Sequence, residues 1–263
     1  MDHKRLTVKD LLGLKGKRQL TQLKVNTVDE ARACEAAGID LFAVSERMDI
    51  RAIRQAAPSC FMTIGFPYGK HINADQVIRA GFAALQVGAD AVYTSVGLDM
   101  VEKMAREGIP VMGHVGFIPY KSTWFGGFKA VGKSAEEALQ IYLHTKAYQD
   151  AGAIGVEIEL VPDKVASAIS KRVQIICLSM GSGIGCDGQY LYATDVLGTN
   201  LGHIPRHAKV YRNLRAEYER IYHEMVAAFD EFRTDTVRGD YPEAKHTLGV
   251  KDEEYAKFLE LLG

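Results

Sequence analysis

Two acidic side chains interrupt an apolar run in the middle of the chain. The segment Gly155–Val161 reads GVEIELV, so Glu157 and Glu159 stand among aliphatic residues. A buried carboxylate is costly unless it is paired or used, and apolar surroundings raise its pKa, which suits a general base. We interpret Glu159 as a candidate general acid or base. Glu157 lies on the same face of the strand as Glu159. It is either a second site residue or a paired charge in the barrel interior.

Other polar side chains follow other apolar runs. His114, within Gly113–Gly116, is either a hydrogen-bonded core histidine or a site residue. Glu46 and Arg47 either pair with each other or serve the site. The glycine-rich segment Gly181–Gly185 resembles a phosphate-binding loop, but glycine-rich loops are common after strands. Further candidates at the ends of such runs are Ser45, Lys70, His71, Tyr93 and Ser95.

Short β-rich runs alternate with helical runs along the chain. The predicted strands are Gln19–Val25, Leu41–Ser45, Phe61–Phe66, Ala91–Val96, Val111–Val115, Gly155–Val161, Ile175–Met180 and, more weakly, Tyr190–Leu197. The predicted helices between them include Asp29–Ala37, Asp75–Val87, Glu102–Glu107 and Ala135–Asp150. Repeated strand–helix units require parallel pairing with right-handed crossovers. Seven or eight of them in about 200 residues favour an α/β fold of the (β/α)8 TIM barrel type, with its site at the C-terminal ends of the strands.

A long helix is predicted after the barrel, from about Arg206 to Arg233, and a polar tail follows it. Because no linker rich in Gly, Pro or Ser is present, we predict one domain over residues 1–263 with a helical extension from about 206. Apolar residues recur along the helix at helical spacing and need a partner surface, either a second copy or the barrel itself. They include Tyr211, Leu214, Tyr218, Ile221 and Val226.

The composition is that of an ordinary globular protein, with 47% hydrophobic and 25% charged residues among 263. A formal net charge of -1 offers no electrostatic argument for a nucleic-acid or anionic-membrane partner. No apolar run is long enough to span a membrane. The cysteines show neither metal-site spacing nor a disulfide framework, so we expect buried free thiols and a cytoplasmic location. They are Cys34, Cys60, Cys177 and Cys186.

Several short motifs occur in a fixed order along the chain. They are Gly113–Ser122 (GHVGFIPYKS), Phe125–Lys133 (FGGFKAVGK), Glu159–Pro162, Gly181–Gly183, Asp187–Gln189, Gly202–Lys209 and Tyr241–His246. Together they resemble the ketopantoate hydroxymethyltransferase (3-methyl-2-oxobutanoate hydroxymethyltransferase) family of pantothenate biosynthesis, over about residues 8–248. The resemblance implies a (β/α)8 barrel of the phosphoenolpyruvate mutase and isocitrate lyase superfamily. It also implies a homo-oligomer, in that family a decamer.

The family reaction moves a hydroxymethyl group from methylenetetrahydrofolate, the co-substrate, to 2-oxoisovalerate. By resemblance, a magnesium ion binds the 2-oxo acid, and the base is a glutamate at the end of strand six. Glu159 occupies the position of that glutamate.

The chain departs from the family at the metal. The family's metal-binding Asp and the Ser after it become Glu46 and Arg47, and a second metal-linked Asp becomes Gly65. The Lys-x-Glu of strand four becomes Tyr93–Ser95 (YTS), and the segment between strands two and three is shorter than in the family. Glu46 is thus the one remaining candidate metal ligand at these positions. We predict weak or absent magnesium binding, with fixed cationic side chains taking over part of the metal's role.

We therefore predict a divergent, hydroxymethyltransferase-like enzyme that makes or breaks a carbon–carbon bond beside the carbonyl of a 2-oxo acid. Glu159 is the predicted acid or base, His114 and Tyr93 assist at the developing enolate, and Arg47 holds the substrate carboxylate. The rest of the predicted substrate-binding set is Ser45, Lys70, His71 and Ser95. Three alternatives stay open: a folate-independent lyase or aldolase of the superfamily, a paralogue with another 2-oxo acid, and a non-catalytic barrel that binds a metabolite or a protein.

Overall fold

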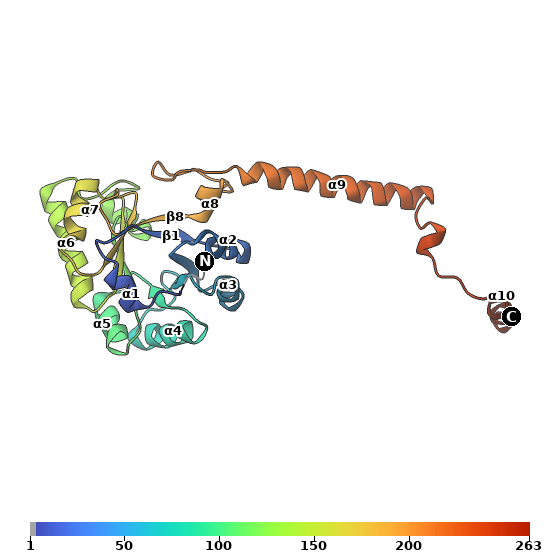
Figure 1. Ribbon diagram of the computed structural model, residues 1–263, viewed down its shortest axis with the longest axis horizontal. Helices are drawn as coiled ribbons and strands as arrows, with labels where there is room; N and C mark the ends of the chain where they lie inside the picture. The colour runs from blue at the N-terminus through green and yellow to red at the C-terminus, as the bar shows by residue number, and fades with distance from the viewer. Residues whose placement is uncertain (1–3) are drawn as a thin grey trace. The chain divides into compact units, whose positions relative to one another are not determined.

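The computed structural model describes residues 4–263, and the chain divides into two units after Arg212. The first unit is a closed barrel of parallel strands in the order β1 to β8, surrounded by helices (Figure 1). The predicted TIM barrel is thereby confirmed. The strands are β1 Leu20–Lys24, β2 Leu41–Ser45, β3 Phe61–Gly65, β4 Ala91–Tyr93, β5 Val111–Gly116, β6 Gly155–Glu159, β7 Ile176–Met180 and β8 Gly188–Tyr192.

Helices follow the strands in the alternation that the sequence predicts. Those of the first unit are α1 Val8–Gly13, α2 Val28–Ala37, α3 Ile50–Ala56, α4 Ala74–Gln86, α5 Leu98–Arg106, the 3-10 helix η1 Pro119–Phe125, α6 Ala135–Asp150, α7 Asp163–Ser170 and α8 Ala193–Leu197. The helix starts are set by side-chain caps: Thr27, Asn73 and Ser134 each accept a hydrogen bond from the backbone N–H three residues later. These caps fix where α2, α4 and α6 begin.

The apolar side chains form two layers, one on each face of the barrel wall. Inward-facing residues such as Leu41, Phe61 and Leu178 fill the interior together with Leu11 of α1. Outward-facing residues such as Phe42 and Val156 pack beneath the helices. Strands covered on both faces read as continuous apolar runs. The four cysteines are buried and free, as predicted.

Four predicted elements differ clearly from the structure. β4 ends at Tyr93 rather than at Val96, and α5 begins at Leu98 rather than at Glu102. The eighth strand ends at Tyr192, and Ala193–Leu197 forms α8 instead of extending the strand. Gly198, in the left-handed region at φ 68°, then ends that helix. The long C-terminal helix, α9, spans Leu214–Arg238 rather than starting near Arg206, because Asn213 caps it through a hydrogen bond from the Ala216 N–H.

The second unit, from Asn213 to Gly263, consists of α9, the 3-10 helix η2 Ala244–His246 and α10 Asp252–Leu262. Apolar side chains of α9 are exposed, among them Tyr218, Ile221, Val226 and Phe229. That this unit and the barrel form one domain over residues 1–263 stays a prediction. No helix within residues 4–263 combines the length and apolar character needed to cross a membrane.

Candidate active site

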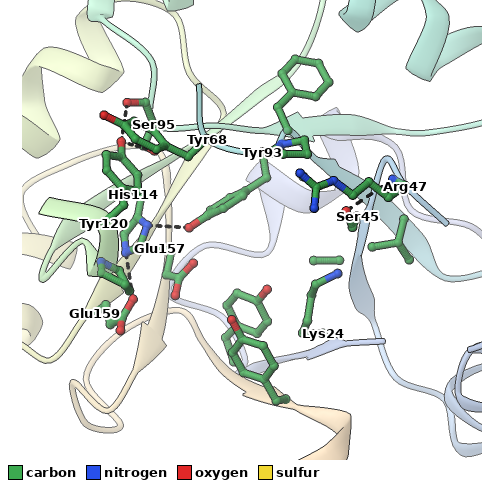
Figure 2. Close-up of a pocket in the computed structure, with 18 residues that line it drawn as sticks. Lys24, Ser45, Arg47, Tyr68, Tyr93, Ser95, His114, Tyr120, Glu157 and Glu159 are labelled. Atoms are coloured by element: carbon green, nitrogen blue, oxygen red, sulfur yellow. Dashed lines mark hydrogen bonds and ion pairs between the residues drawn. The ribbon is translucent and has the colours of Figure 1, made fainter. Parts of the chain in front are cut away.

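A cavity of about 360 Å³ lies at the C-terminal ends of the barrel strands (Figure 2). Six of the predicted site residues line it: Ser45, Arg47, Tyr93, Ser95, His114 and Glu159. Five residues that the sequence analysis did not select also line it: Lys24, Tyr68, Tyr120, Tyr190 and Tyr192. Glu157, whose role the sequence left open, lines it as well. The cavity therefore brings most of the predicted residues together at the expected end of the barrel.

His114, Glu157 and Glu159 form a buried acid–base cluster on one wall of the cavity. The parallel register places His114 of β5 beside Glu157 of β6, and Glu159 shares the face of Glu157 two residues later. His114 Nε2 lies 3.0 Å from Glu159 Oε2, and His114 Nδ1 lies 2.6 Å from the hydroxyl oxygen of Tyr93. The Nε2 contact has the distance of an ion pair but lacks hydrogen-bond geometry, so we treat it as a charge contact. The imidazole of His114 thus lies between the carboxylate of Glu159 and the hydroxyl group of Tyr93.

The electrostatics of this cluster favour the retention of protons. Burial lowers the pKa of His114, but the charges of Glu157 and Glu159 outweigh burial, and the net pKa is raised above 6.5. Burial raises the pKa of Glu157, and the like charge of Glu159 raises it further. Burial and the charge of Glu157 also keep the phenol of Tyr93 protonated, with a pKa well above its usual value. The cluster can therefore hold and pass a proton near neutral pH.

The Gly113–Gly116 motif is explained by the packing around this cluster. A Cβ atom at Gly113 would lie 2.4 Å from the ring of Tyr148, so only glycine lets β5 approach α6 there. Gly116 has φ +83°, and a Cβ atom there would lie 2.4 Å from the backbone oxygen of Glu159. Leu160, the first residue after β6, has the unusual φ of 51°. The backbone is thus held close around Glu159, as at many functional sites.

Two cationic side chains lie on the opposite side of the cavity. Lys24 ends β1 and Arg47 follows β2, whereas His114 and Glu159 belong to β5 and β6, four strands away around the barrel (Figure 2). Within residues 4–263, neither cation has a carboxylate oxygen within 4.0 Å. The cavity thus places unpaired positive charge opposite an acid–base cluster.

Lys24 was missed by the sequence analysis, which examined only residues after the later strands. The signal was the alternation along β1. Leu20 belongs to the interior core, and Gln22 and Lys24 follow on the same inward face at intervals of two residues. A lysine at the last inward position of a barrel strand lies at the site end of the fold.

Glu46, Lys70 and His71 lie outside this cavity and form a separate group. Glu46 Oε1 lies 2.7 Å from Lys70 Nζ, and Glu46 Oε2 lies 3.0 Å from His71 Nε2. Burial raises the pKa of Glu46, but its contacts with Lys70 and His71 outweigh burial and lower it. These residues line a second cavity, of about 450 Å³. Lys70 and His71 thus lie apart from the other predicted substrate-binding residues, and their role in binding stays a prediction; Glu46 pairs with them rather than with Arg47.

The hydroxyl group of Ser95 has a partner within the fold. The Tyr120 hydroxyl donates to Ser95 Oγ at 2.6 Å and lies 3.0 Å from the Ser95 backbone oxygen. The Tyr120 ring stacks on Tyr68, with ring centroids 3.6 Å apart. Ser95 thus helps to build an aromatic rim at the cavity, which can limit the entry of water.

The Gly181–Gly185 segment packs against neighbouring elements. The side chain of Ser182 is buried, donates to the backbone oxygen of Ile158 and accepts from the Val161 N–H. A Cβ atom at Gly183 would lie 2.5 Å from Asp163 Cβ. This close packing explains the glycines without a phosphate ligand.

The family's metal positions do not fit a divalent cation in this chain. Gly65 and Ser95 provide no carboxylate, and the Glu46 carboxylate is bound by Lys70 and His71. Magnesium requires hard oxygen ligands, usually carboxylates, around an octahedral shell. The other candidate is the cluster of His114, Glu157 and Glu159, whose ligand atoms lie within 4.8 Å of one another. One imidazole and two carboxylates suit a transition metal better than magnesium.

Comparisons with known proteins support the family resemblance and the barrel fold. Residues 47–244 match the sequence model of the family described as ketopantoate hydroxymethyltransferase. A 3-methyl-2-oxobutanoate hydroxymethyltransferase 1 from Methylibium petroleiphilum is 35% identical, over 82% of this chain and 72% of that protein. A 3-methyl-2-oxobutanoate hydroxymethyltransferase from Pyrococcus furiosus is 30% identical, over 95% and 94% of the two chains. Among solved structures, a putative phosphonomutase from Burkholderia cenocepacia superposes with a TM-score of 0.56 at 12% identity, covering 86% of this chain and all of that chain.

Proposed function

Because the chain belongs to the ketopantoate hydroxymethyltransferase family, we propose that it makes or breaks a carbon–carbon bond next to the carbonyl of a 2-oxo acid. The supporting observation is the cavity itself, in which Glu159 and His114 face the unpaired cations Lys24 and Arg47. A 2-oxo acid has a carboxylate for the cationic wall. Its acidic C–H bond, beside the carbonyl, faces the wall that holds Glu159 and His114.

Arg47 and Ser45 hold the substrate carboxylate in this proposal. A guanidinium group binds a carboxylate through two parallel hydrogen bonds, which fixes its orientation as well as its position. Ser45 lines the same cavity two residues earlier and offers a hydroxyl group. Because Arg47 has no carboxylate partner among residues 4–263, it is available for a substrate.

Glu159 removes or returns the proton at C3 of the 2-oxo acid. The carboxylate is buried, at 8% relative exposure, and His114 Nε2 lies 3.0 Å from one of its oxygens. His114 and Tyr93 form a hydrogen-bonded pair that can donate a proton or a hydrogen bond to the oxygen on C2 as negative charge develops there. No step in this scheme passes through a metal ion. The electrophile is a one-carbon unit at the oxidation level of formaldehyde.

The experiment that tests this function separates proton transfer from the one-carbon step. Exchange of the C3 hydrogen of 3-methyl-2-oxobutanoate with D2O, followed by NMR, requires no one-carbon donor. Product formation is then measured with methylenetetrahydrofolate, with free formaldehyde and with neither. Turnover only with methylenetetrahydrofolate identifies a folate-dependent transferase. Release or use of formaldehyde without folate identifies the lyase or aldolase alternative. A protein that neither exchanges the proton nor turns over a 2-oxo acid is a non-catalytic barrel, and the proposal is then wrong.

A further inference from the structure

Lys24 is the one charged side chain of β1 that lines the cavity. It is the last residue of β1 and continues the inward face begun by Leu20 and Gln22. Figure 2 shows its amine on the side of the cavity that also holds Ser45 and Arg47. A ligand whose carboxylate is bound by Arg47 and Ser45 therefore presents its neighbouring carbon, C2, on the side of Lys24.

The amine of Lys24 has no anionic partner within residues 4–263. Its single hydrogen bond is to the backbone oxygen of Val25, at 3.5 Å. Lys70, by contrast, lies 2.7 Å from a carboxylate oxygen of Glu46. Burial lowers the pKa of Lys24 to about 8, although the charge of Glu30 acts in the opposite direction. A fraction of the amine is then neutral near physiological pH, which is the nucleophilic form.

Groups that can assist an amine addition lie across the cavity. In the closed order of eight strands, β5 stands opposite β1, so His114 faces Lys24 from the far wall. Tyr93 and Glu157 belong to the same side as His114 in Figure 2. Formation of an imine needs proton donors and acceptors close to the carbonyl oxygen. The opposite wall holds both.

We propose that Lys24 forms an imine with C2 of the bound 2-oxo acid. The inference rests on the proposed function, since it requires a 2-oxo acid in this cavity. The protonated lysine and the ketone yield a protonated imine and one water molecule. The nitrogen–C2 bond forms, the C2–oxygen bond breaks, and two of the three ammonium protons leave with the oxygen. Charge and atoms balance without any further reactant.

A protonated imine at C2 takes the place of a metal as the electron acceptor. When Glu159 removes the C3 proton, the electron pair moves into the C3–C2 bond and neutralises the nitrogen cation. The resulting enamine carbon attacks the one-carbon electrophile, which restores the protonated imine. Addition of water to C2 then releases the product and regenerates the lysine. This route explains why a lysine in the cavity accompanies the loss of carboxylates at the metal positions, Gly65 and Ser95.

Reductive trapping tests the imine directly. The protein is incubated with 3-methyl-2-oxobutanoate and sodium cyanoborohydride, which reduces protonated imines in preference to ketones, and the modified peptide is found by mass spectrometry. We expect a stable secondary amine on Lys24 that depends on both reagents. Lys24→Arg keeps the positive charge but cannot form an imine. Lys146→Arg, on α6 at the surface, is the matched control and retains the adduct on Lys24.

Deuterium exchange at C3 separates this inference from the proposed function. We expect Lys24→Arg to lower the exchange rate by about 10²-fold or more, since the electron acceptor is lost, while Lys146→Arg exchanges at the wild-type rate. If the wild-type protein exchanges the C3 proton but gives no adduct, and Lys24→Arg exchanges equally fast, the imine is wrong and the proposed function stands. If the wild-type protein neither exchanges nor turns over a 2-oxo acid, the proposed function fails and the imine fails with it.

Discussion

The hydroxyl oxygen of Tyr93 lies 2.6 Å from Nδ1 of His114. When His114 carries its proton on Nε2, facing Glu159, Nδ1 accepts a hydrogen bond from Tyr93. When His114 is doubly protonated, Nδ1 donates to the Tyr93 oxygen. Tyr93 stands where the family resemblance places a lysine, so a neutral phenol replaces a fixed charge. The group on this wall that can become positively charged is thus the His114 imidazole, which gains its charge by protonation, rather than a lysine.

Replacing Glu159 by Gln is expected to abolish turnover while leaving the fold intact. Gln keeps the shape of the side chain and removes the ionisable group. General acid–base catalysis contributes roughly 10²–10⁴-fold in rate, and we expect a loss of that size in kcat. The measurements are steady-state kinetics and the melting temperature. A variant that melts earlier but keeps its activity per folded molecule shows that Glu159 is only a structural charge.

Replacing Glu157 by Gln is expected to lower the pKa of His114. The charge of Glu157 is the largest cause that raises this pKa, against the effect of burial. An NMR titration of the imidazole should give a value above 6.5 in the wild-type protein and a lower value in the variant. Glu46→Gln is the control, because Glu46 contacts Lys70 and His71 rather than His114. A titration unchanged by Glu157→Gln contradicts the described electrostatics.

The same shift predicts how stability depends on pH. The folded pKa of His114 is raised above its unfolded value of about 6.5, so the folded protein binds more protons between the two values. The free energy of unfolding therefore falls as pH rises through this window. The contribution of His114 is fully present below about pH 6.5 and is lost above its folded pKa. Chemical denaturation across this range measures the slope, and His114→Gln should flatten it.

Replacing Arg47 by Ala is expected to weaken binding of the 2-oxo acid. A hydrogen bond to a charged group contributes about 1.5–3 kcal/mol, which corresponds to a rise in KM of roughly 10- to 150-fold. Arg47→Lys should recover only part of the loss, because an ammonium group cannot bind a carboxylate through two parallel bonds. Arg106→Ala, on the exposed part of α5 and paired with Glu102, is the control. An unchanged KM in Arg47→Ala places the carboxylate elsewhere in the cavity.

The barrel and most of its site follow from local patterns in the sequence. Apolar runs, capping residues such as Thr27 and Asn73, and glycines after helices set the strand–helix alternation. Strand periodicity placed Glu157 and Glu159 on one face, as observed. The ion-pair partners of Glu46 were harder to predict. Arg47 is its neighbour in the sequence, whereas Lys70 and His71 are its neighbours in space. Contact with Lys70 and His71 depends on how the β2 and β3 ends meet, and the sequence pattern does not encode that geometry.

The exposed apolar side chains of α9 predict a homo-oligomer. Tyr218, Ile221, Val226 and Phe229 are between 45% and 68% exposed. Apolar surface of this kind gains free energy when another surface covers it. Light scattering at micromolar concentration should give a mass well above that of one chain. Ile221→Asp combined with Val226→Asp should lower it, whereas Glu224→Gln on the same helix should not. A monomer in the wild-type protein contradicts this prediction.

The protein is expected to act without a divalent metal ion. At two positions where the family resemblance places carboxylate ligands, this chain has Gly65 and Ser95. Neither residue can replace a charged oxygen ligand. The remaining carboxylate, Glu46, is already bound by Lys70 and His71, which a cation would have to displace. Loss of the anionic ligands leaves magnesium with little to offset the cost of its dehydration. Treatment with a chelator should therefore leave the rate of C3 exchange unchanged.

The competing possibility is a rebuilt site on the acid–base cluster. The ligand atoms of His114, Glu157 and Glu159 lie within 4.8 Å of one another, close enough to share one ion. Against this, the raised pKa values of His114 and Glu157 mean that a metal must displace protons from two buried groups before it binds. Calorimetric titration with magnesium and manganese, with and without a 2-oxo acid, distinguishes the two. Tight binding lost in Glu46→Gln shows that the family site is retained, whereas binding lost only in Glu157→Gln shows a new site. Either result contradicts metal-independent action.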